Sequence, residues 1–322
     1  MNCLITGGTG SLGTALVRSG LDQAWLERLI IFSRDEAKQH EQRRAMSSDS
    51  RISWVIGDVR DLNRIVSSLR GVDIVIHAAA MKQVPICEEN PSEAVMTNIL
   101  GARNIIEAAI RNSVRHVLFV STDKAVHPTS VYGATKLIAE RMIIRANSRD
   151  TGTRFSTVRF GNLIGSRGSV LPLFQEQRRH GRITLTDERM NRFWCTPEEA
   201  AEFIWRVLSI AQGGEVFVPR LPSFWIRDLA WVVAPEARIE IIGIRPGERL
   251  SEILIGPEES RYAFRSGEFF MLIPPLGGGQ PPPGAVRVKE GFCYDSERND
   301  WWLDPMDIAV RLGLSIAIAR AA

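Results

Sequence analysis

One short stretch of the chain, residues 121–136, gathers several side chains that could do chemistry. The run STDK at 121–124 supplies hydroxyls, a carboxylate and an amine, and Tyr132 and Lys136 add a phenol and a second amine. If this stretch is helical around Tyr132, Lys136 lies one turn further along the same face, because the two are four residues apart. An ammonium group and an oxidised nicotinamide near the phenol would lower the tyrosine pKa. The tyrosine could then take a proton from a substrate alcohol.

The position of this stretch separates it from a chance Y-x-x-x-K on an exposed helix. Val114–Val120 is apolar and β-branched, as expected of a buried strand, and it ends directly at the STDK run. In open α/β sheets, ligands bind outside the carboxyl ends of strands. Asp123 and Lys124 are groups that an ordinary alcohol dehydrogenase of this design would not need. They indicate a second reaction after an oxidation.

The amino terminus predicts a strand, a glycine turn and a helix. Cys3–Thr6 is apolar, and a G-x-x-G-x-x-G turn follows it and opens a helix. Such a turn lets backbone amides approach a pyrophosphate. A nucleotide-triphosphate loop would need Lys and then Ser or Thr after the last glycine, whereas Thr14 and Ala15 follow here. The expected dinucleotide contacts in this turn are Gly7, Thr9, Gly10, Ser11, Leu12 and Gly13.

The next strand bears on which dinucleotide is bound. Leu29–Phe32 ends at Ser33, Arg34 and Asp35, about 20 residues beyond the glycine turn, where the adenosine ribose is read. Ser33, Arg34 and Lys38 could hold the extra phosphate of NADP, whereas a carboxylate at Asp35 would suit NAD. The basic residues could instead belong to a solvated helix. We favour NADP over NAD.

Further alternation of strands and helices completes the first half. Strands are expected at 52–56 and 72–76, and a helix from Pro91 to about Asn112, which together predict a Rossmann-type, doubly wound parallel sheet. A helix-capping role of Asp61 competes with a binding role for the segment after the strand at 52–56. The residues after these two strands that we expect at the cofactor are Asp58, Val59, Ala78, Ala79 and Lys82.

Length and composition limit the protein class. A chain of 322 residues can form two lobes, and we expect an NADP-binding Rossmann domain at 1–162 and a smaller substrate-binding lobe at 163–322, some segments of which return to the first. The net charge of +3 gives no nucleic-acid footprint. The four cysteines and five histidines are scattered, which predicts free thiols and no metal site. The strand directly after Met1 and the interrupted apolar carboxyl end predict no secretory signal and no membrane span, and therefore a cytoplasmic protein.

The second half contains fewer signals. Arg245 in the run RPGE could bind a diphosphate and Glu248 could accept from ribose hydroxyls, although an arginine beside Pro-Gly also suits a plain solvated turn. Gly277–Gly284 is rich in Gly and Pro and predicts an exposed loop. The tryptophans at 301–302 predict packing of the terminus or a subunit contact.

Taken in order, these motifs resemble one enzyme family. From TGGTGSLG through HAAAMKQVP, STDKAVHPTSVYGATK and RFGNLIGSRGSV to RMNRFWCT and IRPGERL, the chain is similar to the extended short-chain dehydrogenase/reductases. Within them it resembles the soluble UDP-N-acetylglucosamine 4,6-dehydratases that invert carbon 5 at the head of pseudaminic acid biosynthesis. In the similar membrane-anchored dehydratases, the position of Tyr132 is typically methionine. Tyrosine therefore favours the soluble, inverting type.

The resemblance implies a role for each catalytic residue. Tyr132 would deprotonate the C4 hydroxyl with support from Lys136 and Thr122, while hydride passes to NADP. Lys124 would remove the C5 proton and a protonated Asp123 would protonate the departing C6 hydroxyl; hydride then returns to C6. The implied UDP-sugar contacts are Lys82, Thr122, Tyr132, Asn162, Val170, Arg192, Arg245 and Glu248. Homo-oligomers are usual in the family.

Other functions stay open at this point. A retaining dehydratase or a nucleotide-sugar epimerase would share the first hydride step, and the configuration at carbon 5 separates the two dehydratases. A non-catalytic NADP-binding regulator would be expected to have lost the Tyr132 and Lys136 pair, which this chain keeps.

Overall fold

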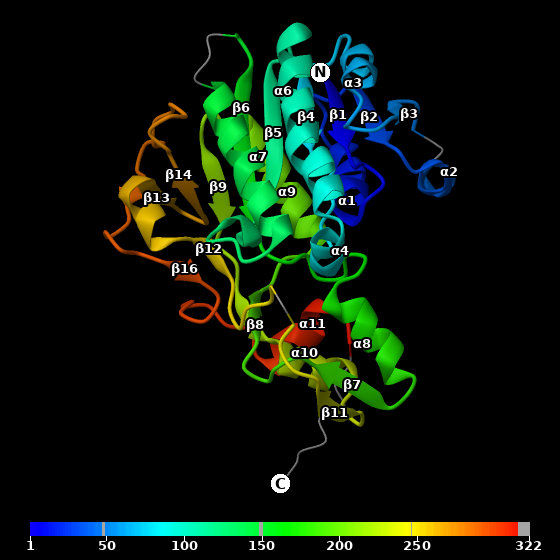
Figure 1. Cartoon of the computed structure of the whole chain (residues 1–322), viewed down its shortest axis with the longest axis vertical. Helices are drawn as coiled ribbons and strands as arrows, with labels where there is room; N and C mark the ends of the chain where they lie inside the picture. The colour runs from blue at the N-terminus through cyan, green and yellow to red at the C-terminus, as the bar shows by residue number, and fades with distance from the viewer. Residues whose placement is uncertain (47–48, 148–150, 246, 315–322) are drawn as a thin grey trace.

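A large, mostly parallel sheet forms the centre of the protein (Figure 1). The computed structural model describes residues 1–46, 49–147, 151–245 and 247–314. The parallel strands are β1 (Asn2–Thr6), β2 (Arg28–Ser33), β3 (Ile52–Ile56), β4 (Ile74–His77), β5 (His116–Thr122), β6 (Arg154–Phe160) and β9 (Val216–Pro219). Antiparallel strands β14 (Phe269–Leu272), β13 (Ala263–Ser266) and β15 (Val286–Arg287) extend one edge. The order in the sheet is β15-β13-β14-β9-β6-β5-β4-β1-β2-β3. The chain therefore places β2 and β3 on one side of β1 and then returns to place β4, β5 and β6 on the other side, which confirms the predicted doubly wound sheet.

Helices cover both faces of the sheet, because its strands alternate two sets of apolar side chains. In β1, Cys3 and Ile5 belong to one core cluster and Leu4 to another. The first cluster lies under α1 (Ser11–Gly20) and α9 (Pro197–Ile210). The second lies under α3 (Leu62–Ser68), α6 (Gly101–Arg111) and α7 (Val131–Asn147). A further helix, α2 (Glu36–Ala45), follows β2.

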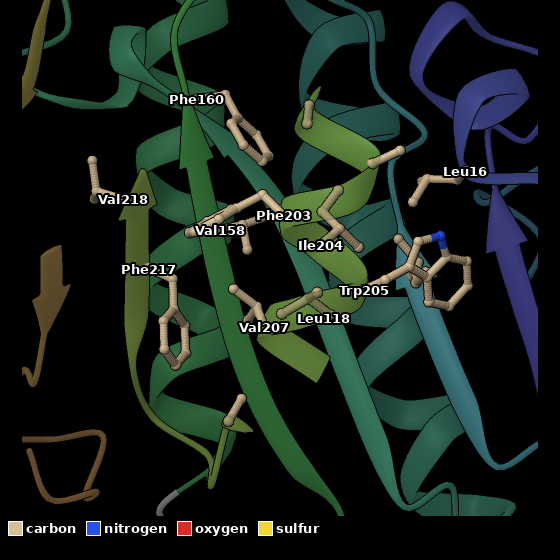
Figure 2. Packing of buried hydrophobic residues seen from close by; sticks show 14 of the residues in the cluster. Leu16, Leu118, Val158, Phe160, Phe203, Ile204, Trp205, Val207, Phe217 and Val218 are labelled. Carbon is tan, nitrogen blue, oxygen red and sulfur yellow. The ribbon is translucent and has the colours of Figure 1, made fainter. Parts of the chain in front are cut away.

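Helix α9 comes from the second half of the chain but packs on the main sheet. Its start is well defined, since Thr196 and Glu199 form a capping box around Pro197. Figure 2 shows Phe203, Ile204, Trp205 and Val207 directed at side chains of the strands and of α1, among them Leu118, Val158, Phe217 and Leu16. Helix α9 and the strands β9, β13, β14 and β15 all come from the second half of the chain, and all of them pack on or extend the main sheet. The boundary at residue 162 otherwise stays a prediction.

A smaller lobe lies below the sheet in Figure 1. It is built from α8 (Val170–Arg178), β7 (Arg182–Leu185), β8 (Asn191–Phe193), β10 (Ser223–Trp225), α10 (Ile226–Val233), β11 (Arg238–Ile241) and α11 (Pro305–Arg311). Its own apolar core includes Phe174, Trp194 and Phe224, the last two in edge contact at 5.3 Å between ring centroids. The short ribbon of β12 (Ile253–Ile255) and β16 (Tyr294–Asp295) is paired separately from the main sheet.

A buried ion network ties the β12 region to the sheet. The Arg159 guanidinium on β6 donates to Glu140 on α7 at 2.6 Å and to Glu259 at 2.8 and 2.9 Å. It also donates to the Leu254 carbonyl at 2.7 Å. Glu259 lies in the 3-10 turn η3 (Pro257–Tyr262), and the Arg159 side chain is only 1% exposed. One arginine therefore joins a sheet strand, a covering helix and the late segment 254–259.

Most local predictions agree with the structure, with two differences. The strand at 52–56 and the Asp61 cap of α3 are confirmed, the latter by acceptance from the Arg64 amide at 3.0 Å. The helix expected from Pro91 contains a π turn, η1 (Val95–Leu100), between α5 (Pro91–Ala94) and α6. Strand β5 runs two residues further than expected, through Thr122. The start of the STDK run is thus held as strand.

The loops and aromatic pair singled out in the second half are also located. Most residues of 277–284 are exposed, as predicted for a Gly/Pro loop, although Gly277 is buried where Asn147 donates to its carbonyl. Trp302 stacks on Trp225 with ring centroids 4.9 Å apart. That pair packs the terminal segment on the smaller lobe.

Candidate active site

A single cavity of about 670 Å³ lies at the carboxyl ends of the parallel strands. It extends from the glycine turn to residues 245–249, between the sheet and the smaller lobe. It brings together nearly every residue predicted at a site: Gly7, Thr9, Gly10, Ser11, Leu12, Gly13, Ser33, Arg34, Lys38, Asp58, Val59, Ala78, Ala79, Lys82, Thr122, Lys124, Tyr132, Lys136, Asn162, Arg192, Arg245 and Glu248.

Two predicted site residues do not line this cavity. Val170 is half-buried at the start of α8, beside the core of the smaller lobe. Asp123 is fully buried behind Thr122 and Lys124, with 0% of its surface exposed. Its carboxylate is linked to the cavity through these neighbours, because Thr122 Oγ1 donates to it at 2.7 Å and Lys124 Nζ at 3.2 Å.

The glycine turn has the geometry of an anion cradle. Gly7 has φ +68°, and a Cβ there would lie 2.9 Å from the Ala79 backbone. A Cβ on Gly13 would lie 2.4 Å from the Gly7 carbonyl oxygen, so only glycine lets α1 begin so close to the turn. No side chain caps α1 at Gly10, which leaves its first amides directed at the cavity. These residues fit a dinucleotide pyrophosphate.

At the adenosine end, the charged residues are differently engaged. Asp35 caps α2 and forms an ion pair with Lys38 at 2.5 Å, so its carboxylate is already occupied. Arg34 is 62% exposed, with Asp58 at 4.0 Å, and its guanidinium can still turn to a ligand. Ser33 Oγ accepts from the Gln39 amide at 3.0 Å.

Tyr132 and Lys136 lie on α7, as predicted, and burial dominates both. Burial lowers the pKa of Lys136 to about 7, and its Nζ donates to the Val120 carbonyl at 2.7 Å. Burial raises the pKa of Tyr132 to about 12, against the lowering effects of the Thr122 hydrogen bond and the Lys124 charge. In the protein alone the phenol is therefore neutral. The acidified phenol stays a prediction for the complex with an oxidised nicotinamide.

Four charged side chains meet beneath this pair, and we call Asp123, Lys124, Arg192 and Glu252 the Lys124 cluster. Lys124 Nζ lies 3.2 Å from Asp123 and 3.3 Å from Glu252, and Arg192 Nε lies 3.4 Å from Glu252. Lys124 Nζ also donates to the Asn162 side-chain oxygen at 2.6 Å. The cluster lies at the carboxyl end of β5, since Asp123 and Lys124 directly follow that strand.

The cluster perturbs the protonation of its members. The pKa of Asp123 is raised to about 6, because burial and the Glu252 charge together outweigh the lowering effects of Lys124 and Thr122. Burial alone would lower the pKa of Lys124, but the carboxylates of Asp123 and Glu252 outweigh it and raise the pKa. Burial would raise the pKa of Glu252, yet Lys124 and Arg192 lower it. At rest the site holds a lysine ammonium beside an ionised Glu252.

Sequence reasoning did not find Glu252 or Arg167 as site residues. Glu252 directly precedes the buried strand β12, and its position four residues after Glu248 is the signal that could have singled it out. The Arg167 side chain donates to the Thr9 carbonyl at 2.9 Å, and its amide to Ser11 Oγ at 3.0 Å. Through these two hydrogen bonds, Arg167 holds a loop from the second half of the chain against the glycine turn.

The remaining predicted substrate contacts lie around the cavity rim. Lys82 Nζ donates to Ser166 Oγ at 3.3 Å, and burial together with the charges of Lys124 and Arg167 lowers the Lys82 pKa. The Arg245 amide donates to the Glu248 carboxylate at 3.2 Å, which forms the local turn. Both side chains nevertheless line the cavity, so a turn and a binding role coexist.

Two negative findings concern the described residues only. Within the ranges that the structure describes, no helix is long and apolar enough to cross a membrane. The same residues contain no group of three or more His, Cys, Asp or Glu side chains placed to hold a metal ion.

Burial raises the pKa of the thiols of Cys3, Cys87 and Cys195, and that of Cys293 to about 11.

Comparison with known proteins gives consistent matches. A family profile described as "Polysaccharide biosynthesis protein" matches residues 3–274. UDP-N-acetylglucosamine 4,6-dehydratase (inverting) of Campylobacter jejuni is 40% identical over 320 residues, which cover 95% of this chain and 96% of the relative. A UDP-glucose 4-epimerase of Rickettsia bellii is 40% identical over 286 residues, covering 85% and 83%.

Solved structures agree with the fold. The X-ray structure of Pen from Bacillus thuringiensis has a TM-score of 0.91 and 38% identity, covering 98% of each chain. DesIV, a dTDP-glucose 4,6-dehydratase from Streptomyces venezuelae determined with NAD bound, has a TM-score of 0.71 and 25% identity, covering 78% of this chain and 87% of that one.

Proposed function

Because this chain belongs to the family described as "Polysaccharide biosynthesis protein", we propose that it is a UDP-N-acetylglucosamine 4,6-dehydratase that inverts carbon 5. One observation carries the proposal. Lys124 and Asp123 follow β5 directly; Lys124 lines the same cavity as Tyr132, and the buried acid Asp123 lies 3.2 Å from Lys124 Nζ. An alcohol oxidation alone needs only the tyrosine and its supporting groups, whereas water elimination needs a further base and acid.

The first step is the removal of a proton from the C4 hydroxyl. A nicotinamide dinucleotide held by the glycine turn would supply a hydride acceptor for carbon 4 and later return that hydride to carbon 6. Tyr132 takes the hydroxyl proton, and Thr122, within hydrogen-bonding reach of the phenol, holds the same oxygen. Lys136, buried and bonded to the Val120 carbonyl, would help to hold the dinucleotide and, in its protonated form, would support the phenolate of Tyr132.

The second step is elimination of water across carbons 5 and 6. The C4 ketone acidifies the C5 proton, and Lys124 as the free amine removes it. The C6–O bond breaks as the hydroxyl receives a proton that originates on Asp123, by way of Thr122 or Lys124, which line the cavity and contact this buried acid. Once hydride is back on carbon 6, carbon 5 takes a proton from solvent water on the opposite face, which gives the L-arabino 4-keto sugar. The UDP moiety binds along Asn162, Arg192, Arg245 and Glu248, with Lys82 between both ligands.

The acid role of Asp123 gives a pH dependence. Its raised pKa of about 6 means that the protonated fraction declines as the pH rises through that value. We expect the rate of methyl-product formation, followed at saturating UDP-sugar, to decline at high pH on an upper limb set by loss of the proton that Asp123 shares with Lys124. Asp123→Asn should remove that limb together with most of the activity. A limb that persists in Asp123→Asn would assign it to another residue.

The choice of NADP over NAD depends on Arg34, whose guanidinium is exposed and only loosely paired. We expect Arg34→Ala to weaken NADP binding by about tenfold or more, since a charge-assisted phosphate contact is lost, and to leave NAD binding nearly unchanged. Isothermal titration of the apoprotein with each dinucleotide measures both affinities. Arg70→Ala, an exposed arginine that does not line the cavity, is the matched control. Equal weakening for the two dinucleotides would contradict the NADP assignment.

One experiment tests the function itself. The purified protein is incubated with UDP-N-acetylglucosamine in deuterated water and the sugar is followed by proton NMR. A new C6 methyl signal with deuterium at carbon 5 and L-arabino couplings is expected. A methyl signal with D-xylo couplings would assign the retaining reaction instead. No methyl signal but a C4-epimerised sugar would favour the activity named for the Rickettsia relatives.

Three further properties complete the proposal. We expect a cytoplasmic enzyme that works as a homo-oligomer and whose product enters pseudaminic acid synthesis. Size-exclusion chromatography with light scattering measures the number of subunits directly. A non-catalytic regulator is disfavoured by the intact Tyr132 and Lys136 pair and would bind NADP without turning over any sugar.

A further inference from the structure

Glu252 has an unusual position for a carboxylate. It directly precedes β12, in the late part of the chain, and its side chain is only 5% exposed. Its backbone is fixed on both sides: the Glu252 amide donates to Ser296 Oγ at 2.9 Å, and the Ser296 amide donates to the Glu252 carbonyl at 2.9 Å. Ser296 Oγ in turn donates to the Asn191 side chain at 2.5 Å. The backbone at Glu252 is thus fixed, and the Glu252 side chain lines the cavity.

The contacts of this carboxylate are with the proposed reacting groups. Glu252 Oε1 lies 3.3 Å from Lys124 Nζ and 3.4 Å from Arg192 Nε. The Glu252 carboxylate also lies within reach of the Asp123 side chain, and the two can share a hydrogen bond when one of them is protonated. Lys124 therefore has two carboxylates within 3.3 Å, one on the adjacent residue and one brought from far along the chain.

The resting charges pose a chemical problem for the proposed reaction. A lysine between two carboxylates is an ammonium, which cannot act as a base, and an ionised Asp123 cannot act as an acid. Transfer of one proton from Lys124 Nζ to the Asp123 carboxylate, 3.2 Å away, solves both at once. The transfer yields a free amine and a neutral carboxyl, consumes nothing else and leaves the total charge of the cluster unchanged.

A fixed third charge acts on both partners of this transfer. Arg192 lies beside Glu252 and favours its ionised form, and the Glu252 carboxylate attracts the Lys124 ammonium and repels the anionic form of Asp123. We propose that Glu252 is a positioning residue that holds the Lys124 ammonium in place and raises the proton affinity of both Lys124 and Asp123. This inference rests on the proposed dehydratase function, which supplies the need for a base and an acid.

Other charges also face Lys124 and belong in the account. The titratable and charged groups around its Nζ, from every segment packed there, are Asp123, Glu252, Arg192, Tyr132 and Lys82. Of these, Arg192 and Lys82 disfavour the ammonium, whereas the two carboxylates favour it. Removing the charge of Glu252 should therefore lower the proton affinity of both Lys124 and Asp123. A change that only loosens the packing should leave these proton affinities unchanged.

The test compares the full-length wild type with Glu252→Gln, which keeps shape and loses charge. The pH dependence of trace acetylation of Lys124, followed by peptide mass spectrometry, gives the midpoint of amine deprotonation. We expect this midpoint to fall by about one pH unit or more in Glu252→Gln. The upper limb of the pH profile for methyl-product formation should move to lower pH as well. Glu252→Asp, which withdraws the carboxylate by one methylene, should give a smaller shift of the same sign.

Glu268→Gln is the matched control, because that glutamate is exposed and pairs with Arg206 on the surface, away from the cavity. It should leave the acetylation midpoint and the pH profile unchanged. A slower Glu252→Gln enzyme with unshifted midpoint and profile would overturn the proposal and leave a purely structural role. If Glu252→Gln does not fold, an unshifted midpoint in Glu252→Asp overturns it equally. Because acetylation needs no turnover, a wild type without dehydratase activity would refute the proposed function separately from the Glu252 effect.

Discussion

Tyr132→Phe is expected to slow methyl-product formation by about 10³-fold, the usual contribution of a positioned proton-transfer group. The phenol is buried at the cavity, within hydrogen-bonding reach of Thr122. Since phenylalanine keeps the ring, the packing against Cys87 and Ala94 should stay intact. The loss should therefore appear in kcat, while the affinity for the UDP-sugar changes little.

The measurement is steady-state kinetics by proton NMR together with calorimetric binding of UDP. Tyr262→Phe removes the same hydroxyl from a residue outside the cavity and should keep wild-type kcat. If Tyr132→Phe retained more than about a tenth of the wild-type rate, the C4 proton would have to leave by another group. The catalytic scheme would then need a different first base.

Arg159→Met is expected to destabilise the folded protein by about 3–5 kcal/mol, the largest stability effect that the structure predicts. The methionine fills similar space, but two buried carboxylates, Glu140 and Glu259, lose their shared cation. The Leu254 carbonyl loses a donor as well. Urea unfolding followed by circular dichroism should show a clearly lower midpoint.

A surface ion pair supplies the comparison for this stability effect. Arg206→Met breaks a contact of 2.8 Å with Glu268, but both side chains are largely exposed, so the cost should stay below about 1 kcal/mol. Neutralising the stranded acids in Arg159→Met/Glu140→Gln/Glu259→Gln should recover part of the lost stability, since uncompensated buried charge causes most of it. Equal midpoints for Arg159→Met and Arg206→Met would contradict the assigned role of the network.

Local patterns were sufficient to predict the cofactor half of the site. The glycine turn between an apolar strand and an amphipathic helix, and the STDK run at the end of β5, are contiguous signals that need no knowledge of distant partners. The same holds for the Tyr132 and Lys136 spacing, which depends only on helical geometry. These predictions agree with the cavity because the ends of parallel strands meet at one edge of a sheet.

Features created by distant contacts could not be predicted in the same way. Glu252 joins Lys124 only because β12 lies beside the 3-10 turn η2 (Asp123–Ala125) after β5, a proximity that no local pattern encodes. The burial of Asp123 and the raised Tyr132 pKa likewise depend on what packs above them. Lys38 looked available for a phosphate, but its pairing with the helix cap Asp35 became visible only in three dimensions.

The segment 252–259 makes two positive charges of the earlier chain depend on residues that are synthesised late. It carries Glu252 into the Lys124 cluster and Glu259 onto Arg159, so one late stretch of chain supplies counter-charges to two cations far earlier in the sequence. A ribosome has finished strands β1 to β6 well before it adds these residues. Until then Arg159 has only part of its partners, and Lys124 lacks one of its two carboxylates. A chain that ends before Glu252 would therefore lack both the full pairing of its buried arginine and the complete set of charges at the proposed site.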